Sequence, residues 1–138
     1  MTYYKGDFAK DTNSKKILIV DDDETFRHLF AELLNKEFEA YEAVGVYDAL
    51  KVLETITVDM IFSDYNMRDG TGLDLLQVCK ERNICVPFIL MSADEGNGLS
   101  RKAELSGIIF CEKTDHDFIG IIRGMLRKEQ IIRGNDDY

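Results

Sequence analysis

Five short segments of the chain have the pattern of buried strands. Four of them are apolar runs at residues 17–20, 60–62, 86–91 and 108–111, and the other is the mixed segment 39–44. Continuous apolar runs of this length are typical of strands that are covered on both faces by helices. The pattern therefore predicts a central sheet rather than a sheet with one face in water.

Between these segments, apolar residues recur every three or four positions, as on one face of an amphipathic helix. The first such stretch begins near Thr25, which we expect to contribute to the helix start. Others lie around 49–56, 73–82 and 118–126, whereas 94–105 is polar and rich in glycine and predicts the least regular helix. Strands that alternate with helices predict a doubly wound α/β domain with a five-stranded parallel sheet.

Polar residues suited to phosphoryl chemistry follow the predicted strands. They are Asp21, Asp22 and Asp23 after the first strand, Asp64 after the third, Ser92 after the fourth and Lys113 after the fifth. Because the carboxyl ends of parallel strands meet at one edge of a sheet, these groups are expected to face one crevice. Carboxylates about 4 Å apart repel by roughly 4 kcal/mol per pair at an effective dielectric constant near 20, so the cluster favours a cation. Because all of these carboxylates offer oxygen ligands, which Mg²⁺ prefers, the predicted cation is Mg²⁺.

Asp64 ends a central strand and is the best placed nucleophile for forming an acyl phosphate. The hydroxyl of Ser92 and the ammonium of Lys113 can then contact the phosphoryl oxygens, which carry a charge of about −1.5 to −2 by analogy with phosphate esters.

Four motifs surround these positions. They are ILIVDDD at 17–23, MIFSDYNM at 60–67, ILMSA at 89–93 and GIIFCEK at 107–113. Together they resemble the receiver domain of bacterial two-component response regulators over about residues 16–130. The resemblance implies a flavodoxin-like (βα)5 fold with strand order 2-1-3-4-5.

The resemblance also implies roles for individual residues. Asp64 would be the phosphoacceptor, and Asp22, Asp64 and the backbone carbonyl of Asn66 would ligate Mg²⁺ directly, with Asp21 acting through water. Lys113 would pair with the phosphoryl group.

On phosphorylation, the hydroxyl of Ser92 would move toward the phosphoryl group and the ring of Phe110 would turn inward. These movements would alter the surface of the fourth helix, fifth strand and fifth helix. The implied partners are a sensor histidine kinase or histidine phosphotransfer domain as donor and a downstream protein target, with a homodimer through the same surface as a further option. The protein would be a signalling phosphoacceptor rather than an enzyme, limited to self-catalysed phosphotransfer and autodephosphorylation.

Two positions depart from the usual receiver pattern, which has proline where this chain has Arg68 and Thr114. The bond between Lys113 and Thr114 is expected to be either trans with a reshaped loop or cis, which costs about 2.5–4 kcal/mol before a non-proline residue. Asn66 and Asp94 are small polar residues that would flank the path of an attacking water and permit autodephosphorylation within seconds to minutes.

Composition limits the other functions. The 138 residues fit one domain, with a polar leader at 1–15, the receiver at 16–130 and a short tail at 131–138. A net charge of −9 has the wrong sign for binding nucleic acid directly. No apolar stretch approaches a membrane span, and three cysteines without ligand spacing predict reduced thiols, so we expect a cytoplasmic protein.

Two other functions remain as alternatives. The stretch from Asp21 to Thr25 also fits the D-x-D-x-T motif of haloacid-dehalogenase-like phosphatases with Asp21 as nucleophile, although this leaves Asp64 without a role. The chain can also be a receiver-like module that binds partners without phosphorylation. Taken alone, Phe110 is more typical of core packing than of a switch.

Overall fold

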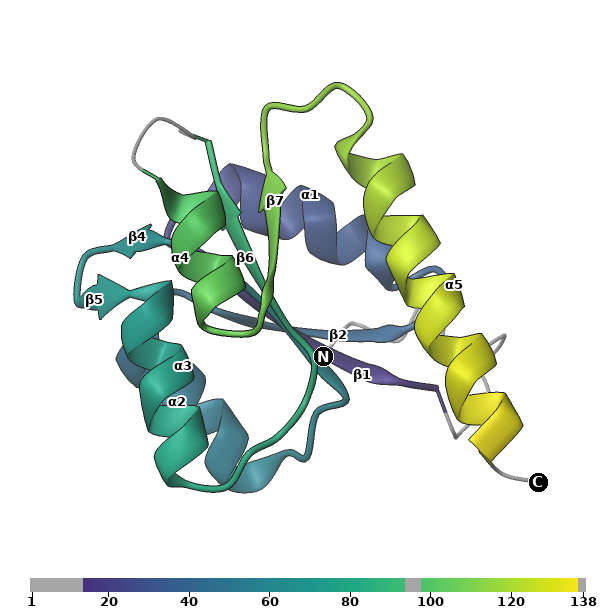
Figure 1. Cartoon of the computed structure of the whole chain (residues 1–138), viewed down its shortest axis with the longest axis horizontal. Helices are drawn as coiled ribbons and strands as arrows, with labels where there is room; N and C mark the ends of the chain where they lie inside the picture. Colours follow the sequence, from purple (N-terminus) through teal and green to yellow (C-terminus); the bar gives the residue numbers. More distant parts are fainter. Residues whose placement is uncertain (1–13, 94–97, 137–138) are drawn as a thin grey trace.

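The computed structural model describes residues 14–93 and 98–136. Its central sheet has the order β2-β1-β3-β6-β7, and every neighbouring pair of strands is parallel. The strands are β1 (Lys16–Val20), β2 (Glu39–Ala43), β3 (Met60–Asp64), β6 (Phe88–Ser92) and β7 (Ile109–Glu112). The predicted five-stranded doubly wound sheet and its order are confirmed, with β6 and β7 as the fourth and fifth strands of the sheet (Figure 1).

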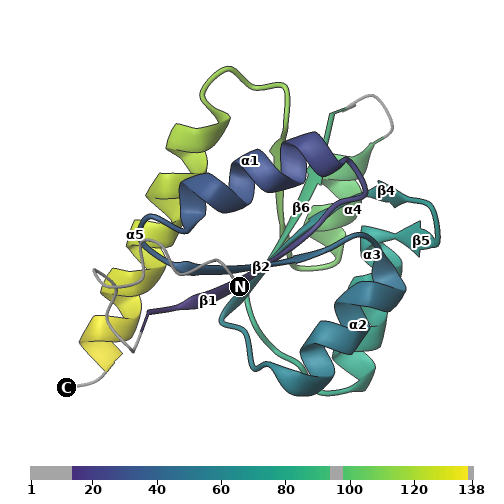
Figure 2. The same cartoon turned by 180° about the vertical axis from the view of Figure 1, so that it is seen from behind.

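Five helices connect and cover the strands. They are α1 (Glu24–Leu34), α2 (Val46–Thr55), α3 (Gly72–Glu81), α4 (Leu99–Leu105) and α5 (Phe118–Asp136). Helices α1 and α5 lie on one side of the sheet, while α2 and α3 lie on the other (Figure 2). Helix α5 continues through the first residues of the segment 131–138 that the sequence pattern had set apart as a tail.

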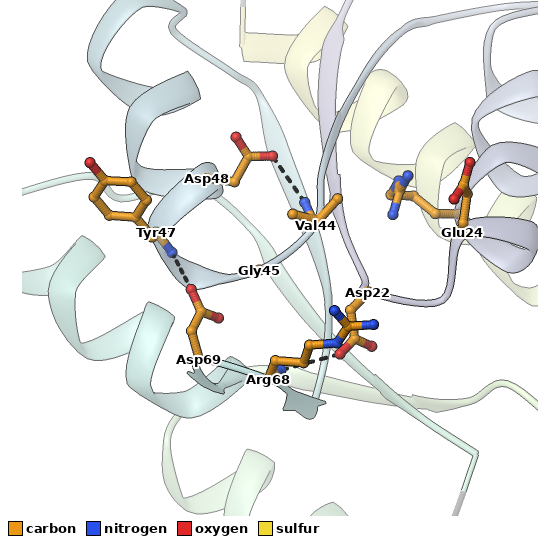
Figure 3. A pocket seen from close by; sticks show the side chains of 9 residues that line it. Asp22, Glu24, Val44, Gly45, Tyr47, Asp48, Arg68 and Asp69 are labelled. Carbon is orange, nitrogen blue, oxygen red and sulfur yellow. Dashed lines mark hydrogen bonds between the residues drawn. The ribbon is translucent and has the colours of Figure 1, made fainter.

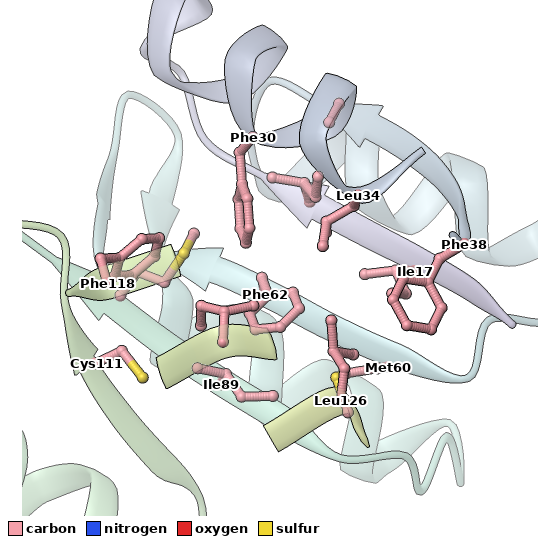
Figure 4. Close-up of a cluster of buried hydrophobic side chains, with 14 residues drawn as sticks. Ile17, Phe30, Leu34, Phe38, Met60, Phe62, Ile89, Cys111, Phe118 and Leu126 are labelled. Carbon is pink, nitrogen blue, oxygen red and sulfur yellow. The ribbon is translucent and has the colours of Figure 1, made fainter. Parts of the chain in front are cut away.

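Alternate residues of the strands divide the core into two layers. In β1, Ile17 and Ile19 pack toward α1 and α5, whereas Leu18 and Val20 pack toward α2 and α3. The first layer also contains Phe30 from α1, beside residues of β3 and β6 (Figure 4). All four of these β1 side chains are fully buried, which explains why the strand is apolar throughout 17–20.

Helix α1 begins beside Thr25, as expected, and its N-cap is Asp23. The backbone of Asp23 is extended, and its carboxylate accepts a hydrogen bond from the backbone N–H of Phe26 at 3.2 Å. Thr25 is an exposed residue inside the first turn. Both residue types are favoured caps, so the backbone conformation of this loop decides between them.

A short antiparallel hairpin, β4 (Asn66–Met67) and β5 (Gly70–Thr71), follows β3 and was not predicted as strands. It leads directly into α3, where Thr71 and Asp74 form a reciprocal capping box. The turn and helix entry expected at 69–72 are therefore confirmed, with an added pair of short strands. The hairpin lies beside the carboxyl end of the sheet (Figure 1).

The polar segment before α4 is partly outside the described residues. Helix α4 has only seven residues, and its N-cap Gly98 has a φ of 68°, a conformation that favours glycine. Among the described residues, no helix combines the length and the apolar composition that crossing a membrane requires.

Candidate phosphoacceptor and metal site

The carboxyl ends of β1, β3, β6 and β7 bring the predicted site residues to one edge of the sheet. The register places Asp64 beside Met91 and Ser92 beside Glu112. Backbone hydrogen bonds continue this alignment beyond the strands, because the N–H of Lys113 donates to the carbonyl of Ser92 at 2.8 Å. Strand pairing therefore fixes the backbone positions from which these side chains extend.

Three carboxylates converge there, and one oxygen each from Asp21, Asp22 and Asp64 lie within 4.8 Å of one another. Asp21 is fully buried, whereas Asp22 and Asp64 are partly exposed. The Oδ1 atom of Asp21 accepts from the backbone N–H of Asp23 at 2.9 Å. Its Oδ2 atom is buried, and the ammonium of Lys113 lies 2.5 Å from it. A carboxylate oxygen has two lone pairs, so this atom can contact a cation in addition to the ammonium.

Lys113 is the counter-charge of the cluster. Its Nζ atom lies 2.5 Å from Oδ2 of Asp21 and 3.2 Å from Oδ1 of Asp64. The side chain is only 12% exposed, and the ammonium also lies 4.4 Å from the centre of the Phe26 ring. One positive charge therefore faces three carboxylates, so the described site keeps an excess of negative charge.

Burial and the neighbouring charges together shift the pKa values of Asp64 and Lys113. Burial raises the pKa of Asp64 from 3.8 to about 6; Lys113 acts against this rise, and the charge of Asp21 adds to it. Burial alone would lower the pKa of Lys113, but its contacts with Asp21 and Asp64 outweigh burial and raise it. At neutral pH, Asp64 is therefore largely ionised and Lys113 is a cation.

A cavity of about 430 Å³ opens beside Asp22 (Figure 3). Arg68 and Asp69 of the hairpin and Val44 and Tyr47 near the start of α2 also line it. The backbone N–H of Arg68 donates to Oδ2 of Asp22 at 3.1 Å, which fixes the orientation of this carboxylate. The cavity gives water and ions a route to Asp22.

Three supporting residues were not predicted from the sequence. The carboxylate of Asp69 accepts from the N–H groups of Val46 and Tyr47, both at 2.9 Å, and so attaches the hairpin to the start of α2. These hydrogen bonds lower the pKa of Asp69. The N-cap residue of α2, Gly45, has no side chain that could accept these hydrogen bonds. Asp69 takes its place from a distant part of the chain, so the residues next to α2 in the sequence do not reveal the cap.

The other two act on the strand ends directly. Buried Arg27 donates from Nη1 to the backbone carbonyl of Asp21 at 2.8 Å and from Nε to Glu42 at 2.8 Å. At Gly72, an added Cβ would lie only 2.6 Å from the backbone oxygen of Asp64, so glycine permits α3 to begin against the end of β3. The sequence signal for Arg27 was its position on the apolar, buried face of α1.

For the other predicted site residues, the structure gives a location and a degree of burial. Ser92 is 5% exposed at the end of β6, and Asn66 is an exposed residue of β4. Phe110 is partly buried in β7 and packs on the core layer of α2, α3 and α4. Its movement, and the role of the Asn66 carbonyl, stay predictions. Asp94 lies outside the described residues.

The receiver family is shown by sequence comparison. The family model of the response regulator receiver domain matches residues 17–110. The chain belongs to this family. It is thus a receiver domain of the kind found in bacterial two-component systems, and the resemblance inferred from its four motifs is confirmed.

Individual relatives agree with this assignment. The regulatory protein VirG of Agrobacterium tumefaciens is 29% identical over 130 residues, covering 88% of this chain and 48% of VirG. The chain thus spans about half the length of this relative. The Francisella response regulator 1452 receiver domain is 25% identical, with a TM-score of 0.73 over 84% of this chain and 98% of that one.

A third similar structure is the Thermotoga maritima response regulator TrrA in complex with Mg²⁺ and BeF. It has a TM-score of 0.70 over 83% of this chain and 97% of that one, at 24% identity. This level of identity shows a shared fold.

The receiver departs from its family at Thr114 without losing the lysine contact. The described residues contain no cis peptide bond, so the bond from Lys113 to Thr114 is trans. The ammonium of Lys113 nevertheless reaches Asp64. Proline at position 114 is therefore not needed to place this lysine. At the other departure, Arg68 supplies a backbone N–H to Asp22 that a proline could not donate.

Proposed function

We propose that this receiver accepts a phosphoryl group on Asp64 in the presence of Mg²⁺ and then signals through protein contacts. The observation that carries the proposal is the convergence of three carboxylates within 4.8 Å, two of them in contact with Lys113. The proposed donors are the phosphohistidine of a sensor histidine kinase or of a phosphotransfer domain. The chain spans about half the length of VirG. What the whole protein does in response to phosphorylation is therefore also a proposal.

The proposed reaction is a phosphoryl transfer to a carboxylate. A lone pair of the ionised Asp64 oxygen forms the new O–P bond while the P–N bond of phosphohistidine breaks. The bonding electron pair stays on the imidazole nitrogen, which takes a proton from water. With acetyl phosphate, the P–O bond breaks and acetate leaves. Lys113 is 3.2 Å from Asp64 and is placed to pair with the phosphoryl oxygens.

The donor set fits Mg²⁺, which binds hard oxygen ligands and keeps part of its water shell. Asp22 and Asp64 would hold the ion, and Asp21, whose Oδ2 contacts Lys113, completes the acidic cluster beside it. Bound Mg²⁺ would neutralise the carboxylates and the incoming phosphoryl charge. The open cavity beside Asp22 leaves room for bound water.

The proposed output surface is the face formed by α4, β7 and α5. Leu105, Ile109 and Ile121 are 74%, 49% and 40% exposed on these elements. Large exposed apolar side chains are suited to a protein partner, including a second copy of the chain. In the proposal, Ser92 and Phe110 connect Asp64 to this face, since they belong to the adjacent strands β6 and β7.

Mass spectrometry of the intact protein tests the acceptor. After incubation with acetyl phosphate and Mg²⁺, the wild type is expected to gain one phosphoryl group of about 80 Da, and Asp64→Asn none. Asp69→Asn is the matched control, because it removes an exposed carboxylate from the neighbouring hairpin, and it should gain the group. Loss of Mg²⁺ should abolish the gain.

The same experiment separates the alternatives. A gain that survives Asp64→Asn but disappears in Asp21→Asn would support the phosphatase-like reaction. The full burial of Asp21 and its hydrogen bond to Asp23 count against that outcome. No gain in any variant would support an interaction module that works without phosphorylation.

A further inference from the structure

We infer that Phe26 is a positioning residue for Lys113, whose ammonium it holds beside Asp64 through the face of its ring; this inference rests on the proposed phosphoryl transfer. The Nζ atom of Lys113 lies 4.4 Å from the ring centre. That distance is within the range of about 6 Å in which an aromatic face attracts a cation. The lysine side chain is 12% exposed, so water screens the attraction only in part.

The ring of Phe26 is held firmly in place. Its backbone N–H donates to the cap residue Asp23, which fixes its position in the first turn of α1. Its ring centre lies 5.7 Å from that of Phe30 and 5.8 Å from that of Phe118. Phe30 in turn packs edge-on against Phe62 and Phe118 in the core (Figure 4). A cluster drawn from three elements therefore supports the surface on which the ammonium rests.

The contact with the ring differs in kind from the other contacts of Lys113. Asp21 and Asp64 attract the ammonium by charge, and both belong to the carboxylate cluster that a divalent cation would neutralise. The ring of Phe26 has no net charge and is not a metal ligand. Its attraction for the ammonium therefore persists when the carboxylates are neutralised. This is the state in which Lys113 must still face the phosphoryl group.

The competing explanation is that Phe26 only fills space beside the lysine stem. Fluorinated phenylalanines separate the two, because they nearly preserve ring shape while reducing and then reversing the negative charge of the ring face. We would incorporate 4-fluoro- and pentafluorophenylalanine at position 26 of the full chain. The initial rate of Asp64 phosphorylation by acetyl phosphate with Mg²⁺ is the measured quantity, and the thermal midpoint verifies folding.

The expected result is a graded loss, reaching about tenfold with pentafluorophenylalanine at position 26, as expected for a cation over a partly desolvated ring. The matched control is the same residue at position 30, whose ring belongs to the same aromatic cluster and is 2% exposed. At position 30 the rate should change less than about twofold, because the ammonium of Lys113 rests on the ring of Phe26 and not on that of Phe30.

Equal rates across the series at position 26, in a protein that is phosphorylated on Asp64, would overturn the inference and leave the proposed function intact. Equal losses at positions 26 and 30 would also overturn it, since they would indicate a general packing effect. If the wild type is not phosphorylated on Asp64, the proposed function and this inference both fail.

Discussion

Replacing Asp64 by asparagine is expected to stabilise the protein at neutral pH. The folded protein raises the pKa of this carboxyl to about 6, chiefly by burial, from the ordinary value of 3.8. Between these two values the native state binds more protons than the unfolded state, so the stability of the wild type falls as pH rises through this window. Asparagine is close in shape to the protonated acid and carries no charge to desolvate.

The size of the effect follows from the shift. A rise from 3.8 to about 6 corresponds to about 3 kcal/mol, at 1.36 kcal/mol per pKa unit. Because the side chain is 13% exposed, solvent screening removes only part of this energy. We therefore expect Asp64→Asn to increase the free energy of unfolding by about 2–3 kcal/mol above pH 7, and by close to zero at pH 4.

Urea unfolding followed by circular dichroism, at about pH 4 and pH 7.5 with a chelator present, measures both values. Asp69→Asn is the control with the opposite sign. Hydrogen bonds lower the pKa of Asp69, so it stabilises the native state above its unfolded pKa, and that contribution is lost as pH falls through its folded pKa. An Asp64→Asn gain that is equal at both pH values, or a destabilisation at pH 7.5, would refute the argument that burial dominates at Asp64.

Three further outcomes are expected. Gly72→Ala should destabilise the protein by about 1–3 kcal/mol in urea unfolding, because its Cβ would lie 2.6 Å from a backbone oxygen; an unchanged midpoint would contradict this. Asp69→Ala should cost about 1 kcal/mol by removing the cap of α2, measured in the same way; no loss would mean that water replaces the carboxylate. Millimolar Mg²⁺ should raise the thermal midpoint of the wild type and raise it less in Asp22→Asn; equal shifts would place the ion elsewhere.

Much of the fold followed from local patterns. The fully apolar run at 17–20 predicted a strand covered on both faces, and the structure buries all four residues. The acids after β1 and β3 could be assigned to one site because parallel strands end at the same edge of a sheet. The contact between Lys113 and Asp64 is the expected consequence of that topology. In these cases, the physical reason is repetitive backbone geometry, which the residue pattern expresses directly.

The supporting contacts depended on tertiary structure. Asp69 caps a helix that begins 23 residues earlier in the chain, and Phe26 meets Lys113 from a different element. The hydrogen bond of Arg27 to the Asp21 carbonyl needs α1 to pack at one particular rotation on the sheet.

The sequence by itself determined which acidic and basic residues follow the strands and at which edge of the sheet they stand, because parallel strands end at one edge and the strand pattern is repeated backbone geometry. Only the packed structure decided the exposure of each carboxylate, the raised pKa of Asp64 and the partners of Lys113. These properties arise from desolvation and from contacts between elements distant in the chain, and local spacing carries no signal for either.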